Sequence, residues 1–143
     1  MTNKEITSFF QRIAHLTPEQ KPLFGKMNAH QMVCHCTDQI RLALGTLKAK
    51  EYGKLSPKEV FAFSNVGRTV PTPKGLGQVE GDGTKPTTFE NDVVILKRHI
   101  SEFSKLDSNF EFGAHPYFGM LNKEKWTSLT LYHLDHHLKQ FGV

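Results

Sequence analysis

The sequence predicts an all-α protein, an antiparallel four-helix bundle formed by a single domain. In four separate blocks, apolar residues recur at the spacing that places them on one face of a helix. Capping residues, glycine and proline mark where these blocks begin and end. Four amphipathic helices with long connections are the simplest assembly that buries all of these faces. The blocks are residues 2–16, 28–45, 88–106 and 122–141.

The first two helices have clear boundaries in the sequence. The first stops at Pro18, because proline lacks a backbone donor and restricts the residue before it. The second opens at Asn28, which suits an N-cap, and ends at Gly45, which suits the left-handed position after a helix. A short additional helix is predicted to begin at Ser56 and Pro57.

A long connection separates these helices from the last two. Between Gly67 and Thr88 the chain is rich in proline and glycine, which predicts a long loop within one domain. We expect this loop to act as a flexible lid or as an edge of a binding site. The next helix has apolar residues at alternating steps of four and three, the seam of an antiparallel bundle. The last helix begins at Asn122, a second suitable N-cap. The predicted core contains Phe10, Met32, Leu96, Ile100, Phe103 and Trp126.

The bulk composition fits one globular domain. The 143 residues are 38% hydrophobic and 22% charged, and no apolar run is long enough to span a bilayer. The N-terminus lacks the pattern of a secretory signal, so we expect a cytoplasmic protein. The net charge of +4 is spread along the chain without a nucleic-acid motif. We therefore expect no nucleic acid and no membrane as partner, and a monomer or a homodimer.

The two cysteines, Cys34 and Cys36, are expected to be buried and reduced. On a helix, residues two positions apart point about 200° away from each other, which excludes a mutual disulfide. We interpret both as small buried hydrophobes in a reducing compartment.

The last helix carries the most informative motif, a pair of histidines four residues apart, His133 and His137. This spacing brings both rings to one face, the face on which Trp126 is expected to turn toward the core. Neighbouring histidines cannot both be protonated cheaply there, and a divalent metal removes that cost by binding both neutral rings. Alternatively, the pair lies at a solvated helix end, where cationic side chains are favourable.

A metal held by two histidines of one helix needs a third ligand from elsewhere, and His35 is the best candidate. It lies in the middle of the second predicted helix, among residues typical of a core. The pairing on the last helix has one alternative. His136 points about 100° away from His137 and would replace it as the partner of His133 if the helix were rotated.

Other polar residues are expected around the three histidines. Gln140 and Asp38 each lie three residues beyond a predicted ligand, where a side chain can orient an imidazole. Asp38, His30 and His115 are the candidates for a proton carrier. The sequence offers no Ser-His-Asp or Cys-His nucleophile arrangement, so a bound metal would be the main catalyst.

Two segments of the chain resemble the DinB/YfiT-like superfamily of proposed metalloenzymes. One is KMNAHQMVCHCTDQI in the second helix, and the other is HPYFGMLNKEKWTSLTLYHLDHHLKQFG in the C-terminal third. More narrowly, they resemble a DinB-related family of unknown function that carries the HP-FG and W-L-H-DHHL-QFG signature. The chain departs from the commoner relatives at Cys34 and in the length of the loop from Gly67 to Thr88, which leaves the substrate class open.

This resemblance implies a bundle in up-down-down-up order and a divalent metal, Ni or Zn, bound by His35, His133 and His137. It also implies open coordination positions and, in several relatives, thiol-dependent transfer or isomerisation of small molecules. We therefore expect a metal-dependent transferase or hydrolase that acts on a small molecule and uses a low-molecular-weight thiol. The alternative is a non-catalytic bundle that binds a small ligand or a partner, with histidines that serve structure alone.

Overall fold

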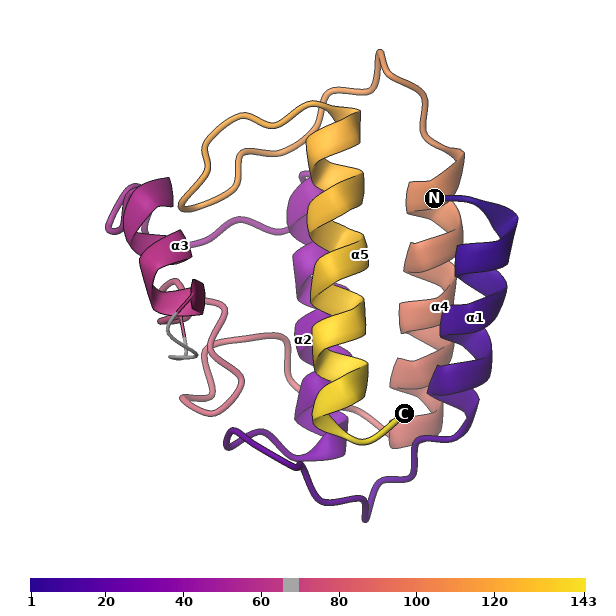
Figure 1. The fold of residues 1–143 in the computed structure, drawn as a ribbon. Helices are drawn as coiled ribbons and strands as arrows, with labels where there is room; N and C mark the ends of the chain where they lie inside the picture. Colours follow the sequence, from indigo (N-terminus) through magenta and orange to yellow (C-terminus); the bar gives the residue numbers. More distant parts are fainter. Residues whose placement is uncertain (66–69) are drawn as a thin grey trace.

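The computed structural model of the protein describes residues 1–65 and 70–143, with side chains for 1–63 and 70–143 (Figure 1). These residues form five helices and no strand. Four of them begin and end within two residues of the boundaries that the sequence predicts, and the short helix α3 begins where it is predicted to begin. The five helices are α1 (Asn3–Ala14), α2 (Ala29–Ala43), α3 (Pro57–Asn65), α4 (Phe89–Lys105) and α5 (Lys123–Gln140).

Side-chain caps fix where the helices begin. Both asparagines that the sequence identifies as N-caps accept a hydrogen bond from the backbone three residues on, Asn28 from Gln31 at 2.8 Å and Asn122 from Lys125 at 3.0 Å. Gln31 also reaches back to the Asn28 N–H, which completes a capping box. The caps thus satisfy amide groups that a helix leaves unpaired at its N-terminus.

Four of the helices, α1, α2, α4 and α5, lie side by side. α2 packs against α4 and α5, and α1 packs against the same two helices. In the view of Figure 1, α1 and α5 run downward while α2 and α4 run upward. α3 stands apart and makes no helix–helix contact within the described residues. The long segment that carries α3 therefore joins two parallel helices, α2 and α4.

The core matches the predicted one except at one position. Met32, Leu96, Ile100, Phe103 and Trp126 are buried, as predicted. The prediction of Phe10 as a core residue is wrong in part, because Phe9 takes the inward position and Phe10 packs at the edge of the core. There the ammonium group of Lys97 lies 5.7 Å from the centre of the Phe10 ring.

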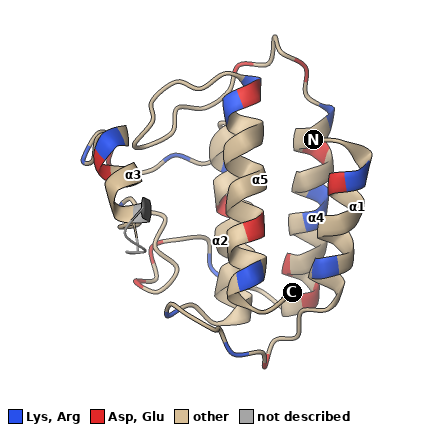
Figure 2. Ribbon diagram, in the orientation of Figure 1, with Lys and Arg blue, Asp and Glu red and all other residues tan. Residues whose placement is uncertain are grey.

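Charged residues of both signs occur on every helix (Figure 2). None of the helices in the described parts of the chain is long and apolar enough to cross a membrane. The charged side chains form several ion pairs, such as that between Arg12 Nη1 and Asp135 Oδ1, 2.9 Å apart, which joins α1 to α5.

The segment 70–88 contains neither helix nor strand, and residues 67–69 of the predicted loop lie outside the described residues. A buried carboxylate, Asp38 on α2, anchors this segment. Its oxygens accept hydrogen bonds from Thr84 N at 2.9 Å, Thr84 Oγ1 at 2.5 Å and Gln78 Nε2 at 3.1 Å. Arg41, also on α2, donates to Thr84 Oγ1 at 2.8 Å. The segment is thus tied to the helix that also carries His35.

We predict that Asp38→Ala lowers the free energy of unfolding by about 2–4 kcal/mol, because one buried and two partly buried donors lose their acceptor. Urea denaturation followed by circular dichroism measures the change. The control is Asp107→Ala, since Asp107 is exposed and, among the described residues, its carboxylate accepts a hydrogen bond from Asn109 N within its own turn. The control is expected to stay within about 0.5 kcal/mol of the wild type. Equal stability of both variants would contradict an anchoring role for Asp38.

Candidate metal centre

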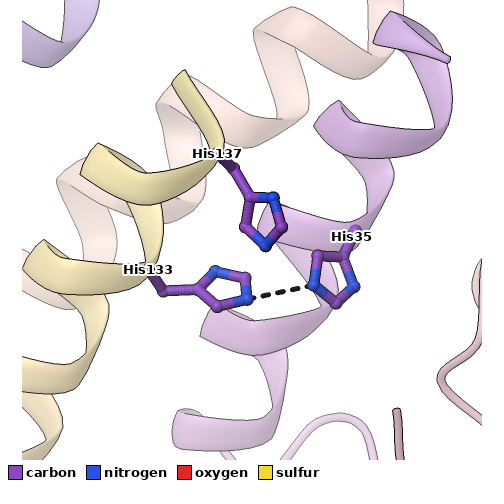
Figure 3. A group of neighbouring side chains, drawn as sticks. All are labelled: His35, His133 and His137. Atoms are coloured by element: carbon purple, nitrogen blue, oxygen red, sulfur yellow. Dashed lines mark hydrogen bonds between the residues drawn. The ribbon is translucent and has the colours of Figure 1, made fainter. Parts of the chain in front are cut away.

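Three histidine side chains from two helices meet in the contact between α2 and α5. His35 comes from the middle of α2, and His133 and His137 come from successive turns of α5. The Nε2 atoms of His35 and His133 lie 3.0 Å apart, and one nitrogen from each ring lies within 4.8 Å of the others. Figure 3 shows the three rings facing a common space between the helices. The structure thus brings together the three residues that the sequence predicts as ligands.

The helix geometry explains why these rings converge. His133 and His137 are four residues apart, so they leave one face of α5. α2 packs against that face in the opposite direction (Figure 1). One turn farther along, Gln39 Nε2 donates to Thr130 Oγ1 at 3.2 Å. The contact of His35 with His133 and the contact of Gln39 with Thr130 are therefore two successive polar layers of one interface.

Gln140 fixes the orientation of the His137 ring, as the sequence predicts. The Nδ1 atom of His137 lies 2.9 Å from Gln140 Oε1. The amide nitrogen of Gln140 donates to the backbone oxygen of Phe24 at 2.6 Å, which leaves Oε1 as the atom that faces the ring. Because Oε1 can only accept, His137 Nδ1 carries the proton and Nε2 keeps its lone pair. A buried histidine with an oriented free lone pair is suited to bind a metal.

All three rings are neutral at pH 7. Burial, together with the neighbouring His136, lowers the pKa of His35 to about 4. Burial and the facing His35 ring lower the pKa of His137 to about 3. The pKa of His133 is also well below its ordinary value. Burial is the main cause, and a positive charge on His133 would also be repelled by positive charge on the neighbouring His137 and His35 rings. Neutral imidazole is the form that binds metal.

The residues fit a divalent metal ion of intermediate softness, such as Zn or Ni. The donor set consists of three neutral imidazoles, and one of them is already oriented by an outer partner. Within the described residues, His133 Nδ1 is buried without a hydrogen-bond partner, and so is Gln39 Oε1 in the adjacent layer. Buried polar atoms seldom lack a partner, so these two atoms are available to hydrogen-bond a ligand or a water molecule.

His136 lies beside the centre. Its ring stacks on Tyr132, with centroids 6.0 Å apart, and is 5.4 Å from the ring of Phe24. The alternative pairing of His133 with His136 is therefore not the arrangement that the structure forms. The three aromatic rings instead border the surface next to His137.

His115 stabilises the turn before α5. Its Nδ1 accepts hydrogen bonds from the backbone N–H groups of Tyr117 at 3.1 Å and Phe118 at 3.2 Å. Its ring lies 5.5 Å from that of Trp126. Burial lowers the pKa of His115 to about 4, so the ring is neutral. Since Nδ1 accepts, Nε2 carries the proton, and any proton transfer by His115 has to use Nε2.

Asp38 and His30 contact residues other than the three histidines. The prediction that Asp38 orients a metal-bound imidazole is wrong, because Thr84 and Gln78 supply three donors to its oxygens. His30 turns toward α4, where its Nε2 lies 2.7 Å from Asp92 Oδ2. No hydrogen bond or ring contact joins Asp38 or His30 to the three histidines in the part of the chain that the structure describes.

A second group of metal-ligand side chains, not predicted from the sequence, lies between α2 and α4 and consists of His30, Cys34 and Asp92. Burial, with the charge of Asp92, raises the pKa of the Cys34 thiol to about 12, so the thiol donates to Asp92 Oδ2 at 3.6 Å. The spacing of His30 and Cys34 on one helix face is the signal in the sequence. Asp92 is 58 residues from Cys34, and only packing brings it there. Cys34 and Cys36 are both free and buried, as predicted.

One protein family matches this chain. Its model, described as "Protein of unknown function (DUF1569)", covers residues 71–142, half of the chain. The match includes α4 and α5, and so His133, His137 and Gln140, whereas α2 with His35 lies outside it. No curated protein and no solved structure matches the chain. By this match, the chain belongs to the DUF1569 family of proteins of unknown function.

Proposed function

We propose that the protein is a divalent-metal-dependent enzyme that acts on a small molecule. One observation carries this proposal: three neutral histidines from α2 and α5 face one space, and Gln140 orients one of them. Three neutral ligands leave a bound ion with its full charge and an open position, so the ion can polarise an oxygen or sulfur atom of a substrate. Transferase or hydrolase chemistry that uses a low-molecular-weight thiol fits such a centre.

In that reaction, the side chains of this protein would position the metal ligands and the substrate. Gln140 holds His137 through a chain of hydrogen bonds that ends at Phe24 O. Leu134 and Leu138, which follow His133 and His137 on α5, are buried in the hydrophobic core and so fix α5 against its neighbours. The aromatic rings of Phe24, His136 and Tyr132 border the centre on its outer side, where a small substrate with an apolar part would be held.

We also propose that the fold is a DinB/YfiT-like four-helix bundle in up-down-down-up order. The directions of α1, α2, α4 and α5 in Figure 1 support this proposal, because the first and last helices run one way and the middle two run the other way. The long crossover between α2 and α4 is what such an order requires. We place the protein in the cytoplasm, as a monomer or a homodimer that binds neither nucleic acid nor membranes.

One observation favours a second hypothesis, in which the protein is a non-catalytic binding protein and its histidines are structural. The contact of His35 Nε2 with His133 Nε2 at 3.0 Å is a good hydrogen bond if one ring donates and the other accepts. Metal binding separates the two readings, because both of these lone pairs are needed for a shared ion.

We expect His133→Ala to bind one equivalent of Ni²⁺ fewer than the wild type at pH 7.5. A site filled at about 100 times its dissociation constant stabilises the fold by about 2.7 kcal/mol, so melting should rise by roughly 5–10 °C when the site is filled. Near pH 5 the rise in melting temperature should shrink, since protons compete with the metal for the rings. Isothermal titration measures the stoichiometry, and thermal melting with and without Ni²⁺ measures the rise. His99→Ala is the control, because His99 bonds its own helix at Ile95 O. Equal stoichiometry in all three proteins would favour the structural reading.

Gln140→Ala should weaken Ni²⁺ binding at this centre by roughly 10–100-fold, because His137 loses the partner that sets its tautomer. Competition with a chromophoric chelator measures the affinity. The matched control is Gln78→Ala, which removes another buried glutamine whose amide bonds Asp38 and Thr84. Weakening by the same factor in both variants would show a general loss of stability in place of a specific effect on His137.

The metal-free protein should lose stability as the pH falls below 6.5. His35 and His137 have pKa values of about 4 and 3 in the folded chain, against 6.5 when unfolded. The unfolded chain therefore binds more protons, and each ring costs about 1.4 kcal/mol of stability at pH 5.5. Urea unfolding with a chelator present, at pH 7.5 and 5.5, should show a difference of about 3 kcal/mol or more. A flat profile would mean that the rings are not held neutral.

A further inference from the structure

A second set of metal-ligand atoms lies between α2 and α4, away from the three histidines. His30 and Cys34 occupy successive turns of α2, and Asp92 lies in the first turn of α4. Their ligand atoms all lie within 4.8 Å of one another. Cys34 is 3% exposed and Asp92 6%, while the His30 side chain is 21% exposed. The group is therefore enclosed, with one member that reaches solvent.

The distances are close to those of a tetrahedral zinc site. Bond lengths of about 2.0 Å to nitrogen and oxygen and 2.3 Å to sulfur place neighbouring ligand atoms about 3.3–3.6 Å apart. Here the Cys34 Sγ to Asp92 Oδ2 distance is 3.6 Å, and the His30 Nε2 to Asp92 Oδ2 distance is 2.7 Å. An opening of roughly 0.6 Å between His30 and Asp92 would bring that pair to the zinc spacing.

Outer contacts already orient the carboxylate and the imidazole. Thr87 donates to both oxygens of Asp92, from its backbone N to Oδ2 at 2.8 Å and from its hydroxyl to Oδ1 at 2.9 Å. The rings of Phe89 and His30 pack nearly at right angles, with centroids 5.7 Å apart. Such partners are what hold metal ligands in place in protein sites. The carboxylate therefore needs no new support in order to bind an ion.

We propose that His30, Cys34 and Asp92 form a second metal site, one that takes a thiophilic divalent ion such as Zn²⁺. Thiolate, imidazole and carboxylate together are a zinc-type donor set, with a fourth position open to water on the exposed side of His30. Binding releases the thiol proton of Cys34 to solvent, and the proton on His30 Nε2, which the acceptor-only carboxylate of Asp92 requires, moves to Nδ1. Bonds to the ion then replace the hydrogen bonds of His30 and Cys34 to Asp92, while those of Thr87 remain. The ion links α2 to α4, whereas the three-histidine centre links α2 to α5, so neither site depends on the other for its ligands.

Metal stoichiometry tests this site separately from the three-histidine centre. Zn²⁺ alone is the probe, counted by titration against a chelator in the full chain. Cys34→Ser is expected to bind one equivalent fewer than the wild type, and this difference should persist when both proteins also carry His133→Ala. The control is Cys36→Ser, because Cys36 is buried against Met32 on α2 and lies outside the cluster. Equal zinc content in Cys34→Ser and wild type would overturn the proposal, whatever His133→Ala does.

Cobalt substitution identifies the ligand directly. Co²⁺ bound to a thiolate has a charge-transfer band in the near ultraviolet, which a site of three histidines lacks. We expect this band in the wild type, in Cys36→Ser and in His133→Ala, and its loss in Cys34→Ser. Asp92→Asn is the second variant and should bind Co²⁺ at least tenfold more weakly. Far-ultraviolet circular dichroism checks that each variant is helical. A band that survives in Cys34→Ser, or none in the wild type, would overturn the site.

Discussion

The burial of α2 is the constraint on which the rest of the structure depends. Eleven of its fifteen residues are buried, although the helix carries histidine, cysteine, threonine, aspartate and glutamine. A helix enclosed in this way must provide a specific partner for each polar side chain, because an unpaired buried polar group is costly. It does so on three faces: His35 meets α5, Cys34 and His30 meet α4, and Asp38 meets the loop.

These faces differ in how completely their polar groups are paired, and that difference separates structural from functional roles. Asp38 accepts hydrogen bonds at both oxygens and so serves to hold the loop. The face toward α5 is less complete, since His133 Nδ1 and Gln39 Oε1 are buried without a partner among the described residues. There burial forces the rings to be neutral instead of pairing them with an acid. A ligand has most to contribute at the interface whose polar groups are least satisfied.

Local signals in the sequence predicted most of the fold and part of the site. Helix boundaries followed from periodicity and from caps such as Asn28, both of which act within a few residues. The spacing of His133 and His137 fixed their common face for the same reason. Periodicity could not choose between Phe9 and Phe10, because adjacent apolar residues satisfy either orientation of the helix. Asp92 required packing, since no local rule connects it to Cys34.

Asp38 shows a different limit of sequence reasoning. A side chain three residues beyond a ligand can reach an imidazole, but the spacing says nothing of competing donors. The segment 70–88 brings Thr84 and Gln78 close to the carboxylate, and their three donors occupy it. The loop therefore decides whether Asp38 pairs with an imidazole or with the donors of segment 70–88, and the sequence of α2 alone does not predict this choice.

Both candidate centres are divided between the two halves of the chain. The part that matches the family model, residues 71–142, supplies His133, His137 and Asp92. α2, outside that match, supplies His35 to one group and His30 with Cys34 to the other. Neither group is complete until α2 has docked between α4 and α5. Because a metal binds the assembled ligands and not the separate ones, binding at either place would stabilise that docking directly. Without a ligand, the buried polar residues of α2 lower the stability of the fold. With a bound metal, the same residues would link α2 to α4 and α5.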